Sequence, residues 1–231
     1  MKGNCCTGEC ASLKQSVLSE LSNQERCNLR GNAISLNLRR GQNIFEQGRE
    51  PEGLFCIQQG KVRVALESHK GEKVTVGLYA DRGTLGHESL FATTNAYTAT
   101  CLSDATVCFL PKMLLKRSMS SYPSIYQRVH ELVADETFQL NEVILSLRSK
   151  SVGQRLAEAL IKLQNVFGKT SDGYIDAELT KEEIAYLVGS SVESIFRALS
   201  DFKTKKYLQL SERKIKILAE TKLRSLGRIY S

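Results

Sequence analysis

A glutamate and an arginine, Glu193 and Arg197, stand four residues apart in the segment SSVESIFRALSDF. In a helix, this spacing places the two side chains one turn apart on the same face. A guanidinium can bind guanine O6 and N7 together, and a carboxylate can accept a hydrogen bond from cytosine N4. The pair therefore has the chemistry needed to read neighbouring base pairs in a DNA major groove.

Basic residues concentrate beside this pair. Residues 184–231 hold ten Lys and Arg against four Asp and Glu, and so carry most of the formal net charge of +7. Lys205 and Lys206 are part of this basic segment. A basic face neutralises phosphates, which makes double-stranded DNA the expected partner. A solvated surface helix is the alternative, but it does not explain why the charge gathers at one end of the chain.

Two short helices around a glycine turn are expected to position the pair. Thr180 can cap the first helix with Glu183 completing a capping box, and Gly189 can end it. Ser190 is expected to cap the second helix, again with an acidic residue three positions on. The expected buried face of the second helix consists of Val192, Ile195, Leu199 and Phe202. This is the helix-turn-helix unit, whose second helix enters the major groove.

The outward face of the second helix and its flank hold the candidate DNA-binding residues. These are Ser191, Glu193, Ser194, Phe196, Arg197, Lys205 and Lys206. Two roles are open for Phe196: contact with a thymine methyl group, or packing against a β-hairpin wing. The alternation in YLQLSERKIKIL predicts that wing.

A second set of reactive side chains consists of cysteines. Cys5, Cys6 and Cys10 lie within six residues, and Cys108 stands in TVCFLP. Four thiolates are the usual complement of an iron–sulfur cluster. Closely spaced thiols also suit another metal ion or reversible thiol oxidation. The sequence leaves these alternatives open.

Two further cysteines and the N-terminus bear on the cell compartment. Cys56 and Cys101 fall within expected strands and should act as small core residues. MKGNCCTGEC lacks the apolar core of a signal peptide. No apolar run approaches the ~20 residues that span a bilayer. We expect a cytoplasmic protein without membrane contact, in which structural disulfides are not expected.

Four regions follow one another along the chain, and together they predict an α+β fold. Residues 1–30 hold the N-terminal cysteines and helix. Residues 31–123 alternate short strands with glycine turns, which is typical of a compact β-roll. Residues 124–148 form one long helix. Residues 149–231 hold a helix, a strand in YIDAEL, the helix-turn-helix and the wing.

The long helix carries an apolar stripe close to a heptad seam. Its members are Ile125, Val129, Leu132, Val133, Leu140, Val143, Ile144 and Leu147, and Glu136 interrupts them. Such a stripe needs a partner, and a two-fold mate in a homodimer is expected. Packing against the β-roll of the same chain is the alternative.

The order of these parts resembles the Crp/Fnr family of bacterial transcription regulators. The resemblance rests on GQNIFEQGREPEGLFCIQQGKVRV, RLAEALIKL and LTKEEIAYLVGSSVESIFRALSDFKTKKYL, and covers nearly the whole chain. It implies a cyclic-nucleotide-binding-like jelly roll, a dimerisation helix and a winged helix-turn-helix. It also implies a homodimer that reads an inverted repeat with a TGA-like half-site core and contacts RNA polymerase. Glu193 and Arg197 match the family's base readers, and Val192 resembles the Fnr branch.

The resemblance also places an effector pocket. Members that bind cyclic AMP carry Gly-Glu and Arg-Ser motifs there. The matching residues here are Gly86-His87 and Tyr97-Thr98, with Glu88 one position late. Tyr97 cannot form a bidentate pair with a phosphate, so cyclic AMP is not expected. Another small molecule, or haem at His87, stays open.

Oxygen-sensing Fnr proteins hold a [4Fe–4S] cluster with three N-terminal cysteines and one at the position of Cys108. The spacing of Cys5, Cys6 and Cys10 is tighter than the family pattern C-x2-C-x5-C. A redox, oxygen or nitric oxide signal through a cluster therefore stands beside thiol oxidation as an expectation.

Two other classes of function were weighed. One is a cyclic-nucleotide-binding-like module that acts on a protein partner, and Glu193, Arg197 and the basic tail argue against it. The other is an enzyme that uses cysteine-bound metal. The chain has three histidines and neither a phosphate-cradling glycine motif nor an evident nucleophile and base. No enzymatic activity is therefore expected.

Overall fold

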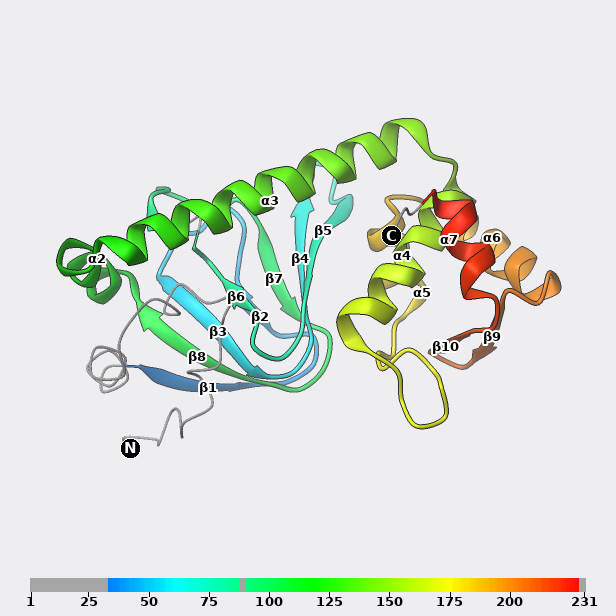
Figure 1. Cartoon of the computed structure of the whole chain (residues 1–231), viewed down its shortest axis with the longest axis horizontal. Helices are drawn as coiled ribbons and strands as arrows, with labels where there is room; N and C mark the ends of the chain where they lie inside the picture. The colour runs from blue at the N-terminus through cyan, green and yellow to red at the C-terminus, as the bar shows by residue number, and fades with distance from the viewer. Residues whose placement is uncertain (1–32, 88–89, 229–231) are drawn as a thin grey trace. The chain divides into compact units, whose positions relative to one another are not determined.

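The computed structural model describes residues 33–87 and 90–228. The α+β class predicted from the sequence is confirmed (Figure 1). The chain divides into two compact units. One holds the described residues up to Val62 together with Tyr79–Phe138, and the other holds Arg63–Leu78 together with the chain from Gln139 onward. The helix expected within residues 1–30 lies outside the described residues, as do Cys5, Cys6, Cys10 and Glu88.

Two four-stranded sheets form the β-roll. The strands are β1 (Ile34–Leu38), β2 (Asn43–Phe45), β3 (Gly53–Gln59), β4 (Val62–Glu67), β5 (Lys73–Tyr79), β6 (Thr84–Leu85), β7 (Thr98–Cys101) and β8 (Ala105–Pro111). One sheet has the order β1-β8-β3-β6 and the other β2-β7-β4-β5. Strand β6, within DRGTLG, is not evident from the sequence. With only two residues, this strand has no alternation to reveal it.

Side chains alternate across strands β3 and β8, so each strand serves two layers. One face presents Phe55 and Phe109, whose rings stack with centroids 4.9 Å apart, and Phe45 of β2 approaches Phe55 at 5.7 Å. These rings link the two sheets inside the roll. The opposite face presents Leu54 and Leu110, which belong to a separate buried cluster. We call this second surface the helix-covered face.

Two helices pack on the helix-covered face, α2 (Lys112–Ser121) and the beginning of α3 (Pro123–Ser149). Ile125 and Val129 are fully buried in its cluster, and Leu132 and Val133 pack at its edge. The first half of the predicted heptad seam therefore packs against the chain's own sheet, which was the alternative left open by the sequence. The physical reason is that this sheet face is apolar and must be covered.

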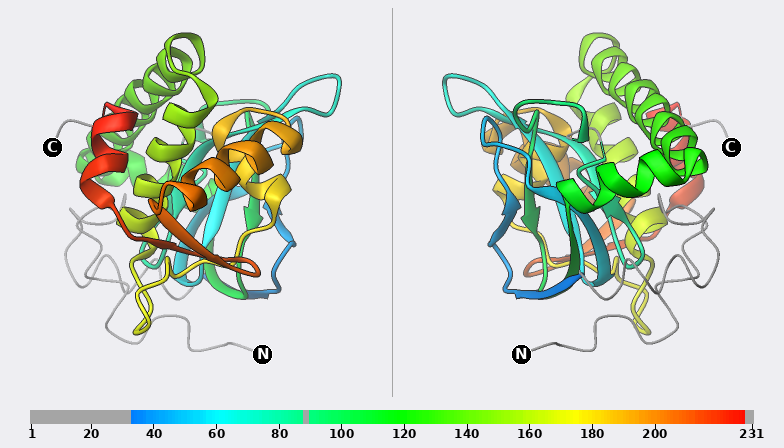
Figure 2. Two further views of the ribbon diagram at one scale, coloured as in Figure 1. Left: turned by 90° about the vertical axis from the view of Figure 1, so that its right-hand side faces the viewer. Right: turned by 90° about the vertical axis from the view of Figure 1, so that its left-hand side faces the viewer.

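The second unit contains a helical domain with a short hairpin. Its elements are α4 (Val152–Phe167), α5 (Lys181–Val188), α6 (Val192–Thr204), β9 (Leu208–Ser211), β10 (Lys214–Ile217) and α7 (Glu220–Gly227). Helix α4 contacts α5, α6 and α7, and the paired strands β9 and β10 extend as a hairpin (Figure 2). The strand expected in YIDAEL is wrong, because only one isolated bridge, between Lys169 and Ile175, forms there.

Gly189 supplies a testable constraint on this unit. It ends α5 with φ +61° and ψ 54°, a left-handed conformation. Gly189→Ala should lower the free energy of unfolding by about 1–2 kcal/mol, since a side chain disfavours that conformation by this amount. Urea unfolding measures the change.

Gly153→Ala is the matched control. It lies in α4 with its nearest neighbour 4.0 Å from an added Cβ, and it should be neutral or stabilising by up to about 1 kcal/mol. Equal effects at the two sites would contradict the role of the left-handed turn.

Candidate functional site

Hydrogen-bonded N-caps fix where each of the two helices of the helix-turn-helix begins. Thr180 and Glu183 form the predicted capping box, with N···O distances of 2.7 and 3.1 Å. The cap predicted at Ser190 is wrong by one residue. Ser191 caps α6, and its hydroxyl accepts from the Ser194 amide at 3.2 Å. The amide of Ser190 instead donates to Ala185 O at 3.1 Å, so Ser190 still belongs to the end of α5.

Arg155 of α4 stabilises the turn between α5 and α6. Its guanidinium donates to Val188 O at 2.7 Å and to Gly189 O at 3.2 Å, and a third bond reaches Lys150 O at 2.7 Å. The carbonyls at the end of a helix lack partners within it. The Arg155 guanidinium therefore provides hydrogen-bond donors to carbonyls at the end of α5 and to the carbonyl of the residue that follows α3.

Helix α6 buries one face and exposes the other. Ile195, Leu199 and Phe202 are buried as predicted. The prediction that Val192 is buried is wrong, because Val192 is the first residue of the helix and is 38% exposed. On the open face, Glu193 and Arg197 have side chains that are 74% and 75% exposed and form an ion pair with each other.

Phe196 lies on the same open face and is 55% exposed. The ammonium nitrogen of Lys181, on α5, lies 4.6 Å from its ring centroid. This is the geometry of a cation–π contact. The ring of Phe196 thus contacts α5. The wing itself is confirmed as the β9–β10 hairpin.

The two candidate phosphate-binding lysines differ in their surroundings. Lys205 is the C-cap of α6 and pairs with Asp201 at 2.8 Å. The hydrogen bond from Lys205 to Asp201 raises the pKa of Lys205. Lys206 has φ +57° and, within the described part of the chain, makes no ion pair. Of the two, Lys206 is the more available to a phosphate.

In the β-roll, the expected effector residue His87 is buried, at 2% exposure. Its Nε2 lies 3.3 Å from Glu136 Oε2 on α3, and the hydroxyl of Tyr79 donates to Glu136 Oε1 at 3.1 Å. This arrangement explains why an acidic residue interrupts the apolar stripe of α3. Tyr97 and Thr98 are half-buried, and the Thr98 hydroxyl accepts from the Gln47 amide at 3.0 Å.

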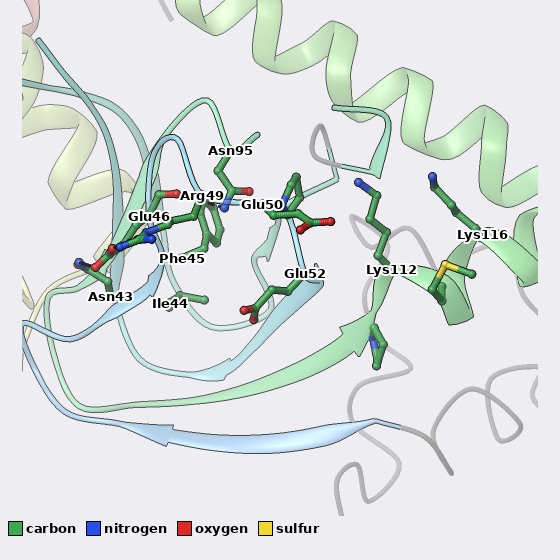
Figure 3. Close-up of a pocket in the computed structure, with 13 residues that line it drawn as sticks. Asn43, Ile44, Phe45, Glu46, Arg49, Glu50, Glu52, Asn95, Lys112 and Lys116 are labelled. Carbon is green, nitrogen blue, oxygen red and sulfur yellow. Dashed lines mark hydrogen bonds and ion pairs between the residues drawn. The ribbon is translucent and has the colours of Figure 1, made fainter. Parts of the chain in front are cut away.

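A separate open cavity of ≈ 1020 Å³ lies elsewhere on the roll (Figure 3). Glu46, Glu50 and Glu52 come from the β2–β3 loop, and Lys112 and Lys116 from α2. The other lining residues are Asn43, Ile44, Phe45, Arg49, Pro51, Asn95, Pro111 and Met113. Among the described effector residues, Gly86, His87, Tyr97 and Thr98 do not line it. The sequence offered only a weak signal for this cavity, an acidic loop and two lysines four residues apart.

The three described cysteines are buried and not linked by disulfides. Cys101 and Cys56 confirm the expected core positions. Burial, with a smaller contribution from Asp104, raises the pKa of Cys101 to about 11. Cys108 is also buried, at 3% exposure. Over residues 33–87 and 90–228, no group of three or more His, Cys, Asp or Glu side chains could hold a metal ion.

The contact between α3 and His87 gives a prediction. Glu136→Ala should lower the free energy of unfolding by about 1–3 kcal/mol, because the buried His87 and the Tyr79 hydroxyl lose their partner. The matched control is Glu131→Ala on the same helix. Glu131 pairs with Arg128 at 2.6 Å near the surface, and its loss should cost under about 1 kcal/mol. Chemical denaturation of both variants decides the matter. Similar losses would mean that the Glu136 contacts contribute no more than a surface pair.

Comparison with known proteins agrees with this architecture. Residues 35–122 match the model of the cyclic nucleotide-binding domain, and residues 154–226 match the Crp-like helix-turn-helix domain. In the part of the chain that the structure describes, no helix is long and apolar enough to cross a membrane.

Known bacterial regulators align with most of the chain. The chain is 25% identical over 192 residues to electron transport regulator A of Shewanella oneidensis, covering 82% of this chain and 77% of that protein. It is 25% identical over 181 residues to a CRP-like cAMP-activated global transcriptional regulator of Mycobacterium tuberculosis, covering 77% and 81%. It is 25% identical over 194 residues to the fumarate and nitrate reduction regulatory protein of Vibrio cholerae, covering 82% and 77%. Because these relatives have the same sequence identity to the chain, the comparison does not favour one branch of regulators over another.

Solved structures share the fold. A Crp/Fnr-family protein from Eubacterium rectale superposes with a TM-score of 0.77 at 23% identity, covering 92% of this chain and 97% of that one. FixK2 from Bradyrhizobium japonicum superposes with a TM-score of 0.76 at 18% identity, covering 86% and 99%. Both domains, their order and the relatives lead to one conclusion: the chain belongs to the Crp/Fnr family of transcription regulators.

Proposed function

We propose that the protein is a homodimeric regulator that reads an inverted repeat in double-stranded DNA through Glu193 and Arg197. The observation that carries the proposal is the geometry of α6. Its apolar face is buried, while the two base-reading side chains are about three-quarters exposed, one turn apart. A helix with one face anchored and the other open can lie in a major groove.

On DNA, the two side chains would exchange their mutual ion pair for base contacts. Arg197 can bind guanine O6 and N7, and Glu193 can accept from cytosine N4. A TGA-like core presents a guanine on one strand and its paired cytosine on the other, so the two side chains together can read both strands. Ser191 and Ser194 already bond to each other, with their hydroxyl oxygens 3.0 Å apart, so we assign them first to capping α6. Phe196 offers its open edge to a thymine methyl group.

Exposed apolar residues on the second half of α3 support the homodimer. Phe138, Ile144 and Leu145 are 68%, 62% and 59% exposed. Large apolar side chains gathered on one helix mark a protein interface. A two-fold pair of such helices would place two α6 helices on adjacent major grooves, about 34 Å apart. Phe138 and Leu145 were missing from the seam predicted in the sequence.

The signal is proposed to act at the β-roll and to be other than cyclic AMP. His87 and Tyr97 stand at the positions of the two charged anchors, and Glu136 places a carboxylate beside His87. A carboxylate there disfavours a phosphate, because like charges repel. By family resemblance, RNA polymerase is the proposed protein partner.

A [4Fe–4S] cluster would depend on residues beyond the described part of the chain. Cys108 lies behind α2 and α3 in the cluster of the helix-covered face, and the described residues do not themselves form a metal site. Cluster sensing therefore rests on Cys5, Cys6 and Cys10, and it requires that they reach Cys108. Iron and sulfide content of protein purified without oxygen tests this form of the signal.

The DNA-reading role of Arg197 is directly testable. Arg197→Ala should weaken binding to a matched inverted repeat by about 1–3 kcal/mol, the value of a good bidentate base contact. Binding to a scrambled sequence should change much less. Fluorescence anisotropy on both DNAs at several salt concentrations provides the measurement. Equal losses on both DNAs would identify Arg197 as a phosphate contact and overturn its assignment.

The two lysines provide the matched control in the same titration. Lys206→Ala should weaken binding to all sequences alike and reduce the salt slope by about one unit. Lys205→Ala should have a smaller effect, because Asp201 already pairs with that ammonium group. A sequence-dependent loss in either lysine variant would contradict the separation of base and phosphate contacts.

The dimer is tested by placing charge on α3. Phe138→Glu combined with Leu145→Glu should convert the dimer to a monomer, because a buried carboxylate without a partner is costly at an interface. Light scattering gives the mass in solution. Leu218→Glu is the control, since Leu218 is 52% exposed but follows the wing. A wild-type protein that is monomeric with and without operator DNA would refute the proposal.

A further inference from the structure

Two cysteines that are far apart in the sequence face each other across neighbouring strands. In the antiparallel pairing of β3 with β8, Cys56 is directly opposite Cys108. Both belong to the buried cluster of the helix-covered face, at 2% and 3% exposure. Directly opposite residues have Cβ atoms about 4.5–5.5 Å apart on the same face of the sheet. The two thiols are therefore immediate neighbours.

The backbone spacing of this pair suits a covalent bond. Opposite residues in antiparallel strands have Cα atoms about 4.5 or 5.5 Å apart. A disulfide spans Cα separations of about 4.4–6.8 Å, so a bridge needs no shift of either strand. We propose that Cys56 and Cys108 are a site of reversible disulfide formation, with a hydroperoxide as the oxidant.

The neighbours of the pair extend it into a row across the whole sheet. Ser35 on the edge strand β1 is opposite Cys108, and Thr84 on β6 is opposite Cys56. Ser35 is exposed, so the row ends at the solvent-exposed edge of the sheet. Thr84 is 6% exposed, and among the described residues its hydroxyl has no hydrogen-bond partner. A buried hydroxyl without a partner is costly, and a charged sulfur at Cys56 would give it one.

The chemistry balances with one peroxide. The Cys56 thiolate, beside the Thr84 hydroxyl, attacks the peroxide oxygen, the O–O bond breaks, and water or an alcohol leaves, which gives a sulfenic acid. The Cys108 thiol then attacks that sulfur and releases water as the disulfide forms. Two electrons pass from the two thiols to the peroxide. A dithiol reductant reverses the bond by thiol–disulfide exchange.

The bond would act directly beneath α3. Ile125 and Val129 pack in the same buried cluster as the two thiols. A disulfide draws the sulfurs to about 2.05 Å, and close-packed interiors respond to small changes in volume. The packing of α3 on the sheet should therefore change on oxidation. An effect on DNA binding rests in addition on the function proposed above.

Peptide mapping of the full chain tests the site itself. Protein purified without oxygen is treated with hydrogen peroxide, unfolded, alkylated, and digested with trypsin and with Asp-N, which cuts before Asp104 and so separates Cys101 from Cys108. We expect a linked peptide pair that contains Cys56 and Cys108 and disappears after treatment with dithiothreitol. Recovery of both residues as alkylated thiols would overturn the proposal, as would linkage of Cys108 to an N-terminal cysteine.

Three variants separate the site from its effect. Cys56→Ser and Cys108→Ser should lose the linked pair. Cys101→Ser, a buried cysteine on the other sheet, should keep it. Oxidation should change operator affinity about fivefold or more in the wild type and in Cys101→Ser, within the usual range of coupling between sites, and leave Cys56→Ser unchanged. An unchanged affinity despite a mapped bridge would refute the coupling to α3. Absence of operator binding in both redox states would refute the proposed function, while the mapping still judges the thiol pair.

Discussion

One guanidinium holds the DNA-binding unit together. Arg155 donates to the carbonyls of Lys150, Val188 and Gly189, which are the residue after α3, the last residue of α5 and the turn glycine. Hydrogen bonds from a charged donor are among the strongest that a protein makes, and a cation at a helix C-terminus also interacts favourably with the helix dipole. The direction in which α6 leaves the turn depends on this contact, because the chain has only Gly189, Ser190 and Ser191 between the two helices.

The long helix α3 serves two roles that its sequence does not separate. Its first turns bury Ile125 and Val129 on the sheet, and its later turns expose Phe138 and Leu145. Glu136 lies between these parts, where it meets His87 and Tyr79. A polar contact at this position ties the end of the buried stretch to the roll. The apolar side chains that follow are left available to a partner.

The elements that depend on short-range patterns were predictable. The Thr180 capping box, the Gly189 turn, the wing and most strands need only residues within a few positions of one another. Errors arose where signals overlap or are too short, as with the adjacent serines before α6 and the two-residue strand β6. Contacts set by tertiary structure could not be inferred. The pairing of His87 with Glu136, and of Cys56 with Cys108, depends on strand order and helix placement. The positions of Glu193 and Arg197 on an open face were predicted correctly, because helical periodicity alone decides them.

The ion pair between Glu193 and Arg197 also has a consequence for errors in recognition. In the unbound protein each side chain is the other's partner, so every DNA sequence must compete with an internal ligand before any base is contacted. If Glu193 and Arg197 read bases as proposed, a matched site replaces the lost ion pair with two new partners, whereas a mismatched site leaves at least one charge unpaired in the groove. The same pair would then discriminate against wrong bases without any residue beyond the two readers.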